Sequence, residues 1–251
     1  MTTFIDLSAT LNSRDQGPRP PSIEYVGHQQ SAERCAAAYG VNQSDFRDSG
    51  YAAIEHLQLT THDTTHLDAP WHYGPTSEGK RAKTIDEIPL EWCYGDGVVL
   101  DFHEKQKGDR ITDIDLKKAL SSIGYQLKPF DIVLIRTDVY QYYGQKDYAD
   151  LNPGMSREAT CWLVEQGIKV MGIDAWGWDR SLGSMIEELK AGNKEQFWES
   201  HYLGKEKEYC HLERLANLDR IPIPFGFKLS VFPIKIEAAS AGWVRAVAII
   251  D

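Results

Sequence analysis

Short apolar runs recur along the chain and predict the strands of a buried sheet. Each run is rich in β-branched residues and is bounded by residues that form turns, which is the pattern of a strand. Four such runs cover residues 4–7, 97–102, 132–135 and 169–173. Two more follow near the end of the chain, around 227–236 and 243–250.

Amphipathic segments lie between these runs and predict helices. The first helix follows a capping box formed by Thr112 and Asp115, and its apolar stripe ends at Gly124. A second helix is predicted to begin at Ser156 and a third at Asn193, both of which can cap a helix. The third helix is expected to carry on one side Phe197, Trp198 and His201.

The order of these elements favours an α/β fold. Strands that are separated by helices indicate a sheet with some parallel pairing. No repeat, low-complexity tract or block of charge divides the sequence, so residues 1–251 are predicted to form a single domain. A surface loop is predicted over residues 17–21, because its prolines disfavour regular structure.

The composition is that of an ordinary globular protein. Of the 251 residues, 42% are hydrophobic and 25% are charged, so extended disorder is not expected. The net charge of −10 argues against binding to nucleic acids, because their phosphates require a basic face. The apolar runs are far shorter than the roughly 18 residues of a membrane span, so no membrane partner is expected.

The cysteines and the first residues predict a cytoplasmic location. The chain begins without the basic segment of a secretory signal and carries an early acid at Asp6. The four cysteines lie far apart and form no C-x-x-C pair, so they are interpreted as reduced thiols. They are Cys35, Cys93, Cys161 and Cys210.

The segment 62–72 carries the strongest chemical signal. It contains three of the eight histidines, at positions 62, 66 and 72, with a carboxylate at Asp68 between them. Neutral imidazoles and carboxylates suit Zn²⁺, Mn²⁺ or Fe²⁺. A wet polar loop with one histidine in the core would explain a single histidine, but it explains this pattern poorly.

Regular secondary structure cannot gather these ligands. On a flat strand His62 and His66 would lie roughly 13 Å apart, which is too far for a shared ion. On a helix, Asp68 would point away from His66. A turn that leads into an extended piece can bring the three together, and Pro70 argues against continued helix.

This segment resembles the signature H-x-G-T-H-x-D-x-P-x-H of the metal-dependent cyclase family, which contains bacterial kynurenine formamidases and isatin hydrolases. Thr64 replaces the glycine, and threonine resists the positive φ that glycine allows. The segments 6–8 and 172–175 resemble other landmarks of the family. His201 and Glu213 have the spacing of the family's distal histidine and glutamate.

The resemblance implies a site and an architecture. It implies a swivelling β/β/α domain with a mixed sheet and flanking helices, assembled as a homodimer or homotetramer. It also implies one or two divalent ions per chain, with Zn²⁺ preferred and Mn²⁺ possible. The implied metal ligands are His62, His66 and Asp68 for the first ion and His201 for the second, with Asp68 and Glu213 as bridging carboxylates. His72 takes the place of the proton donor and acceptor.

The sequence leaves the roles of several other residues open. His211 competes with His201 as the distal ligand, and His201 is preferred because of the family spacing. Trp176 and Trp178 could line a pocket for a flat substrate or pack in the core. Arg180 could meet an anionic substrate or a structural acid such as Asp174 or Asp179. The remaining histidines are interpreted as surface or core residues: His28, His56 and His103.

The function predicted from these residues is that of a metal-dependent hydrolase acting on C–N bonds. A bound ion that activates water would cleave an amide, a cyclic amide or a lactone of a small, aromatic substrate. Residues 11–21 lack the tryptophan that formamidases of this family place there for substrate stacking, which weakens the assignment of N-formylkynurenine. Two alternatives are a non-haem Fe(II) oxygenase and a non-catalytic binding protein stabilised by its metal.

Overall fold

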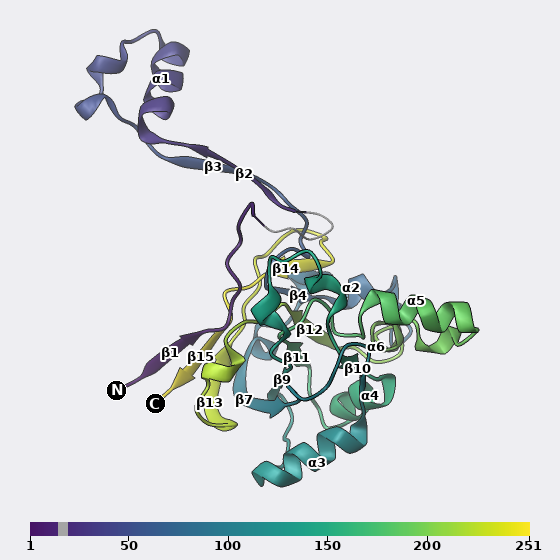
Figure 1. Ribbon diagram of the computed structural model, residues 1–251. Helices are drawn as coiled ribbons and strands as arrows, with labels where there is room; N and C mark the ends of the chain where they lie inside the picture. Colours follow the sequence, from purple (N-terminus) through teal and green to yellow (C-terminus); the bar gives the residue numbers. More distant parts are fainter. Residues whose placement is uncertain (15–19) are drawn as a thin grey trace.

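A nine-stranded mixed sheet forms the body of the protein (Figure 1). The computed structural model describes residues 1–14 and 20–251, so most of the loop predicted over 17–21 lies outside the described residues. The strand order is β1 (Thr3–Asp6), β15 (Val247–Ile250), β13 (Phe225–Ser230), β7 (Tyr94–Asp101), β9 (Ile132–Arg136), β11 (Val170–Ile173), β12 (Cys210–Glu213), β4 (His66–Asp68) and β14 (Ala241–Trp243).

The centre of this sheet is parallel and its two sides are antiparallel. Strands β7, β9, β11 and β12 run in the same direction. Strand β4 pairs antiparallel with both β12 and β14, while β13, β15 and β1 continue the other side in antiparallel pairing. The strand predicted around 227–236 ends at Ser230, and the one predicted over 243–250 is divided between β14 and β15.

Helices α3 (Asp113–Ile123) and α4 (Arg157–Glu165) cover one face of the sheet. The body also contains α2 (Pro70–Tyr73), α5 (Leu182–Ala191) and α6 (Glu199–Leu203). Apolar residues of α3 and α4, such as Leu116 and Leu163, share a core with sheet residues such as Val133 and Met171. The opposite face packs in a second core with residues that include Leu134, Leu212 and Trp92. Two small sheets complete the body: β5 (Thr76–Ser77) with β6 (Lys80–Arg81), and β8 (Arg110–Ile111) with β10 (Gly154–Met155).

Two of the three predicted helices are confirmed and the third is wrong. Thr112 and Asp115 form the capping box of α3, and the Ser156 hydroxyl accepts from the Ala159 N–H at the start of α4. In place of the third helix the chain forms a 3₁₀ turn over Lys194–Gln196 and then α6. Trp198 interrupts the two with a left-handed φ of 55°, which a continuous helix excludes. Helix α5 was not predicted.

An arm formed by residues 22–58 projects away from the body (Figure 1). Its stem is an antiparallel pair of β2 (Ser22–Val26) and β3 (Ile54–Gln58), and its far end carries α1 (His28–Tyr39). Every residue of β3 is exposed. The arm was not predicted, because neither of its strands has a long apolar run.

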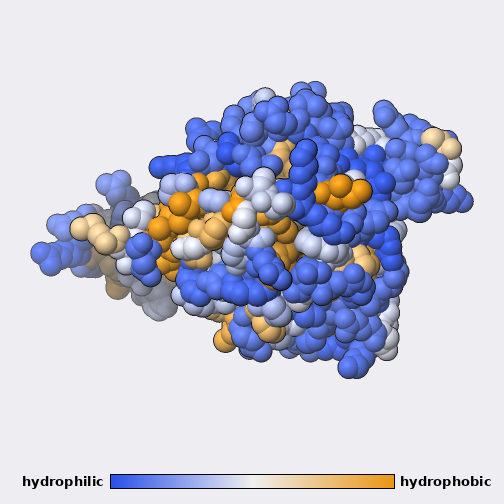
Figure 2. Space-filling view, turned by 90° about the horizontal axis from the view of Figure 1, so that it is seen from below, coloured by the Kyte–Doolittle hydropathy of each residue, from blue (hydrophilic) through white to orange (hydrophobic). Residues whose placement is uncertain are grey.

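The face of the molecule that Figure 2 shows is largely hydrophilic, and apolar side chains gather near its middle. A groove of about 230 Å³ is bounded by α3 and by the segment 218–224. Among the described residues, no helix has the length and apolar character needed to cross a membrane.

The close contact between α6 and α2 gives the first testable prediction. A Cβ atom on Gly204, at the end of α6, would collide with the ring of the buried Tyr73. Gly204→Ala is therefore expected to lower the free energy of unfolding by about 1–3 kcal/mol in urea denaturation. Gly27→Ala, where a Cβ meets open space, is the matched control and should change stability far less. Equal effects of both substitutions would contradict the proposed contact.

Candidate metal centre

The pairing of β4 with β12 brings four polar side chains to one face of the sheet. The strands are antiparallel, with Asp68 opposite His211 and His66 opposite Glu213. Opposite residues point to the same face, and so do residues two apart on one strand. His66, Asp68 and His211 have no exposed surface, and Glu213 is 7% exposed. The sheet therefore concentrates two carboxylates and two imidazoles away from bulk water.

His62 joins this group from the turn 61–65, which leads directly into β4. This confirms the predicted turn followed by an extended piece. Thr64 adopts a left-handed φ of 52°, so it keeps the backbone that glycine would allow, at some cost in strain for a β-branched residue. Its hydroxyl donates to the Ala9 carbonyl at 2.8 Å, and its own carbonyl accepts from His66 Nδ1 at 2.8 Å. The turn thus fixes the ring of His66.

Two short helices supply the remaining histidines. Pro70 occupies the first position of α2, where its missing N–H costs nothing, and His72 lies in the same helix. His201 lies in α6, and its Nδ1 donates to the buried Asp179. Asp179 also accepts from the backbone N–H groups of Ser200 and His201, at 2.8 and 3.1 Å. These bonds hold the imidazole of His201 with its Nε2 directed inward.

Asp68 stands between two groups of histidines. Its Oδ1 lies 2.9 Å from His62 Nδ1 and 3.3 Å from His66 Nε2. Its Oδ2 lies 3.1 Å from His211 Nε2, 3.6 Å from His72 Nε2 and 3.9 Å from His201 Nε2. The two oxygens of one carboxylate therefore serve two separate sets of nitrogens.

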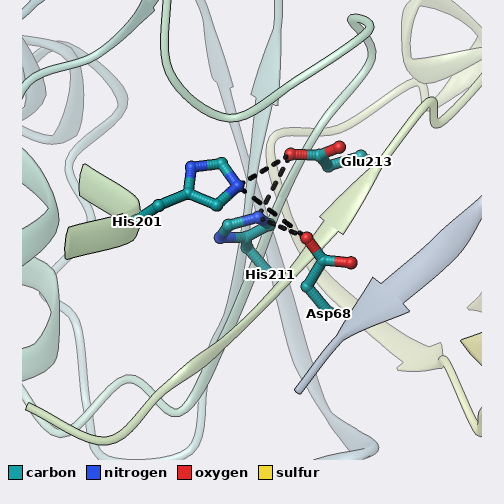
Figure 3. Close-up of side chains that lie close together, drawn as sticks. All are labelled: Asp68, His201, His211 and Glu213. Carbon is teal, nitrogen blue, oxygen red and sulfur yellow. Dashed lines mark hydrogen bonds and ion pairs between the residues drawn. The ribbon is translucent and has the colours of Figure 1, made fainter. Parts of the chain in front are cut away.

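Glu213 divides its oxygens in the same way. Its Oε2 lies 3.6 Å from His66 Nε2. Its Oε1 lies 3.1 Å from His211 Nε2 and 3.6 Å from His201 Nε2 (Figure 3), and it also accepts from the Trp178 backbone N–H at 2.9 Å. Two carboxylates that each face two imidazole groups form the arrangement expected of ligands shared by neighbouring cations.

The donor set fits a divalent metal ion. His66 Nε2 and Asp68 Oδ1 are buried and have no hydrogen-bond partner among the described residues, which is unusual unless a cation meets them. The outer nitrogens of four histidines are occupied, as is typical of metal-binding histidines: His62, His66, His201 and His211. His62 Nε2, for example, lies 3.0 Å from the Ser240 hydroxyl. The predicted divalent metal is therefore supported.

Charge and burial shift the pKa values of this group strongly. Burial lowers the pKa of His72 to about 4, although Asp68 raises it in part. Burial alone would lower the pKa of His211, but its hydrogen bonds to Asp68 and Glu213 raise it to about 9. Burial and Asp68 would raise the pKa of Glu213, but the histidines, His211 first, lower it to about 2. The centre thus holds paired charges out of water.

A cleft of about 540 Å³ opens beside these residues, within the range of small-molecule sites. His62 and His72 line it, with side chains 23% and 24% exposed. Trp176 and Trp198 are part of its wall, and Trp198 stacks on His201 with ring centroids 4.3 Å apart. The cleft therefore joins the open side of the centre to an aromatic surface.

The structure locates three other residues whose roles the sequence left open. Trp178 is fully buried and stacks on His211, so it belongs to the core, whereas Trp176 lines the cleft. Arg180 bonds to neither of the acids considered for it. Its guanidinium instead meets Gln196 at 2.9 Å and Glu188 at 3.4 Å.

All six predicted site residues converge at the centre. The residues that hold their side chains in place were not predicted. Asp179 and Tyr73, which hold His201 and His211, carried no sequence signal of that role. His211 was weighed against His201, but the structure brings both to the centre. Their individual roles stay predictions. The three histidines outside the centre are all exposed: His28, His56 and His103.

Comparisons with known proteins point to one family. The model of the Cyclase family, described as "Putative cyclase", matches residues 5–180. An isatin hydrolase of Roseibium aggregatum is 27% identical over 213 residues, which cover 81% of this chain and 77% of the relative. A kynurenine formamidase of Bacillus mycoides is 22% identical over 200 residues, which cover 80% of this chain and 81% of the relative.

Solved structures agree on the fold. Isatin hydrolase A from Ralstonia solanacearum superposes with a TM-score of 0.78 at 22% identity, covering 100% of this chain and 92% of that chain. An isatin hydrolase bound to the product analogue thioisatinate gives a TM-score of 0.77 at 20% identity, with 99% and 92% covered. The predicted fold class and the predicted family resemblance are confirmed.

The raised pKa of His211 predicts how the metal-free protein responds to pH. The pKa of His211 in the folded state is about 9, above the ordinary 6.5. The stabilisation of the fold by protonated His211 is therefore complete below pH 6.5 and is lost as pH rises to 9. The free energy of unfolding of the metal-free protein should fall by more than about 1 kcal/mol over this interval, measured by urea denaturation. His211→Gln should remove most of this dependence. An identical pH profile in both proteins would contradict the expectation.

Proposed function

The chain belongs to the Cyclase family, and we propose that it is a metal-dependent hydrolase that cleaves a C–N bond of a small aromatic amide or cyclic amide, or the ester bond of a lactone. The relatives named above are an isatin hydrolase and kynurenine formamidases, which supports this class of reaction. A solved structure with a TM-score of 0.63 bears the description of a potential metal-dependent hydrolase with cyclase activity. The substrate itself is left open by these relatives.

The observation that carries the proposal is the division of two buried carboxylates between two groups of imidazoles. We assign His62, His66 and Asp68 to the first ion and His201 to the second, with Asp68 and Glu213 shared. Zn²⁺ is the preferred ion and Mn²⁺ the alternative, because both accept these ligands. A bound ion of this kind lowers the pKa of water to about 7 and polarises a carbonyl group.

His72 is placed to move the proton that such hydrolysis requires. Its depressed pKa of about 4 differs from the near-neutral value assumed from the sequence, so the imidazole is neutral at pH 7. A neutral imidazole can accept a proton from the attacking water and then donate it to the leaving nitrogen or oxygen. His72 borders the cleft, which gives it access to both atoms.

The aromatic part of the cleft wall supports a flat substrate. Trp176, Phe197 and Trp198 all contribute to its wall. Aromatic rings favour offset or edge-on contact with another ring, which contributes about 0.5–1.5 kcal/mol beyond the burial of area. We therefore propose an aromatic group next to the scissile bond.

The two alternative functions account for less of the structure. An Fe(II) oxygenase needs only two histidines and one carboxylate, and so leaves the convergence of His201 and Glu213 unexplained. A binding protein that uses its metal only for folding does not require a neutral His72 at the edge of an open cleft.

The decisive substitution is His72→Ala in protein reconstituted with Zn²⁺ or Mn²⁺. We expect the metal content per chain to remain that of the unaltered protein, while kcat falls by about 10²–10⁴, the range of general acid–base catalysis. N-formylkynurenine, isatin and simple lactones are the substrates to screen, with product formation followed by absorbance.

Controls separate the alternatives. His103→Ala changes an exposed histidine outside the cleft and should leave kcat unchanged. Turnover without oxygen is expected, whereas strict dependence on oxygen would favour the oxygenase. Chelation should abolish activity and leave the fold largely intact, whereas unfolding on chelation would favour the metal-stabilised binding protein. Full activity of His72→Ala would remove the role assigned to this residue.

We also propose that the protein assembles as a homodimer or homotetramer through its arm. A two-stranded ribbon is marginally stable when nothing covers it, and every residue of β3 is exposed. The exposed side chains of the arm include large apolar ones, which favour a protein contact. They are Tyr25, Tyr39, Tyr51, Ile54 and Leu57. A cytoplasmic location stays a prediction.

Assembly is tested by light scattering coupled to gel filtration. We expect a mass that is a multiple of one chain, and we expect the double substitution Ile54→Lys and Leu57→Lys to reduce it. Ile114→Lys makes the same chemical change on α3, at a residue that is 72% exposed, and should leave the mass unchanged. A monomeric mass for the unaltered protein would contradict the proposal.

A further inference from the structure

His211 is the one imidazole of the centre that neither the motif nor the family spacing accounts for. It lies on β12, two residues before Glu213, and is completely buried. Its Nε2 lies 3.1 Å from Asp68 Oδ2 and 3.1 Å from Glu213 Oε1 (Figure 3). These two oxygens are also the nearest carboxylate oxygens to His201 Nε2. His201 and His211 therefore face the same two carboxylate oxygens from two sides.

The outer nitrogen of His211 is already occupied. Its Nδ1 lies 3.2 Å from the hydroxyl of Tyr73, and that hydroxyl donates to the Asp68 carbonyl at 3.4 Å. Because the phenolic proton is directed to the carbonyl, Tyr73 is an acceptor for the Nδ1–H of His211. In the neutral tautomer the lone pair of Nε2 then faces the two carboxylate oxygens. This is how second partners fix histidines that bind metals.

The separations between donors match a four-coordinate ion. With ligand distances near 2.1 Å, donors at a tetrahedral ion are about 3.4 Å apart. The two contacts of His211 are 3.1 Å each, and those of His201 are 3.6 Å to Glu213 and 3.9 Å to Asp68. One donor atom from each of the four residues lies within 4.8 Å of all the others. No large movement is needed to close this set around a cation.

We propose that His211 is a ligand of the second ion, so that four protein side chains hold this ion: Asp68, His201, His211 and Glu213. The inference rests on the metal-dependent function proposed above. Four protein ligands complete the coordination of a tetrahedral zinc ion. His201 and Glu213 line the cleft as His62 does, so both ions would lie beside it.

The test is the metal content of His211→Gln. Metal-free protein is equilibrated with buffered Zn²⁺ over a range of free concentrations, and zinc per chain is measured by mass spectrometry. We expect two ions per chain in the unaltered protein. In His211→Gln we expect the second ion to bind at least about 10-fold more weakly, the lower bound for removing even a supporting partner, while the first is retained. His103→Gln is the control for loss of an exposed histidine and should bind as the unaltered protein does.

A spectroscopic readout identifies the ligand directly. Co²⁺ replaces Zn²⁺ in such sites, and its visible absorption depends on the number and type of ligands. The band of the second cobalt ion should change in His211→Gln, and that of the first should not. Tyr73→Phe removes only the hydroxyl that holds His211, and it should lower the affinity for the second ion by a smaller factor than His211→Gln does. This variant keeps the test open if His211→Gln does not fold.

The outcomes separate the two proposals. If the unaltered protein binds no divalent ion, the proposed function fails and His211 has no ion to hold. If the unaltered protein binds two ions, and both His211→Gln and Tyr73→Phe bind them with unchanged constants and spectra, only the inference about His211 is overturned. His211 would then be a protonated hydrogen-bond donor to two carboxylates.

Discussion

Two carboxylates buried side by side constrain everything around them. Taking a charged group out of water is costly, and two like charges on neighbouring strands add their mutual repulsion. Asp68 and Glu213 are tolerated because imidazoles approach them from several sides, which lowers the pKa of both groups. Those imidazoles come from a turn, two strands and two short helices, so the fold must converge at this point. The antiparallel join of β4 to the parallel sheet makes that convergence possible.

The motif could be found in the sequence because its geometry is local. His62, His66 and Asp68 lie within a few residues, and elementary strand and helix geometry already required a turn followed by an extended piece. The structure has that form. Even the threonine at position 64 follows the backbone expected of glycine, because the hydrogen bonds of its hydroxyl and carbonyl fix it there.

What the sequence could not supply depends on pairing between distant segments. The partnership of β4 with β12 decides that His211 and Glu213 face Asp68 and His66, and no local pattern encodes that register. The same holds for Asp179 behind His201. The prediction of the third helix was wrong for a different reason. The segment 193–203 has a propensity for helix, but this propensity is overridden at Trp198, whose ring stacks on His201.

The arm and the centre share one stretch of chain. Strand β3 ends at Gln58, and the turn that carries His62 begins almost at once. A partner that binds the arm would therefore also restrain the backbone that carries His62. A change in oligomeric state would in this way shift the position of His62 at the edge of the cleft. Quaternary structure would then influence catalysis at a distance from the subunit contact.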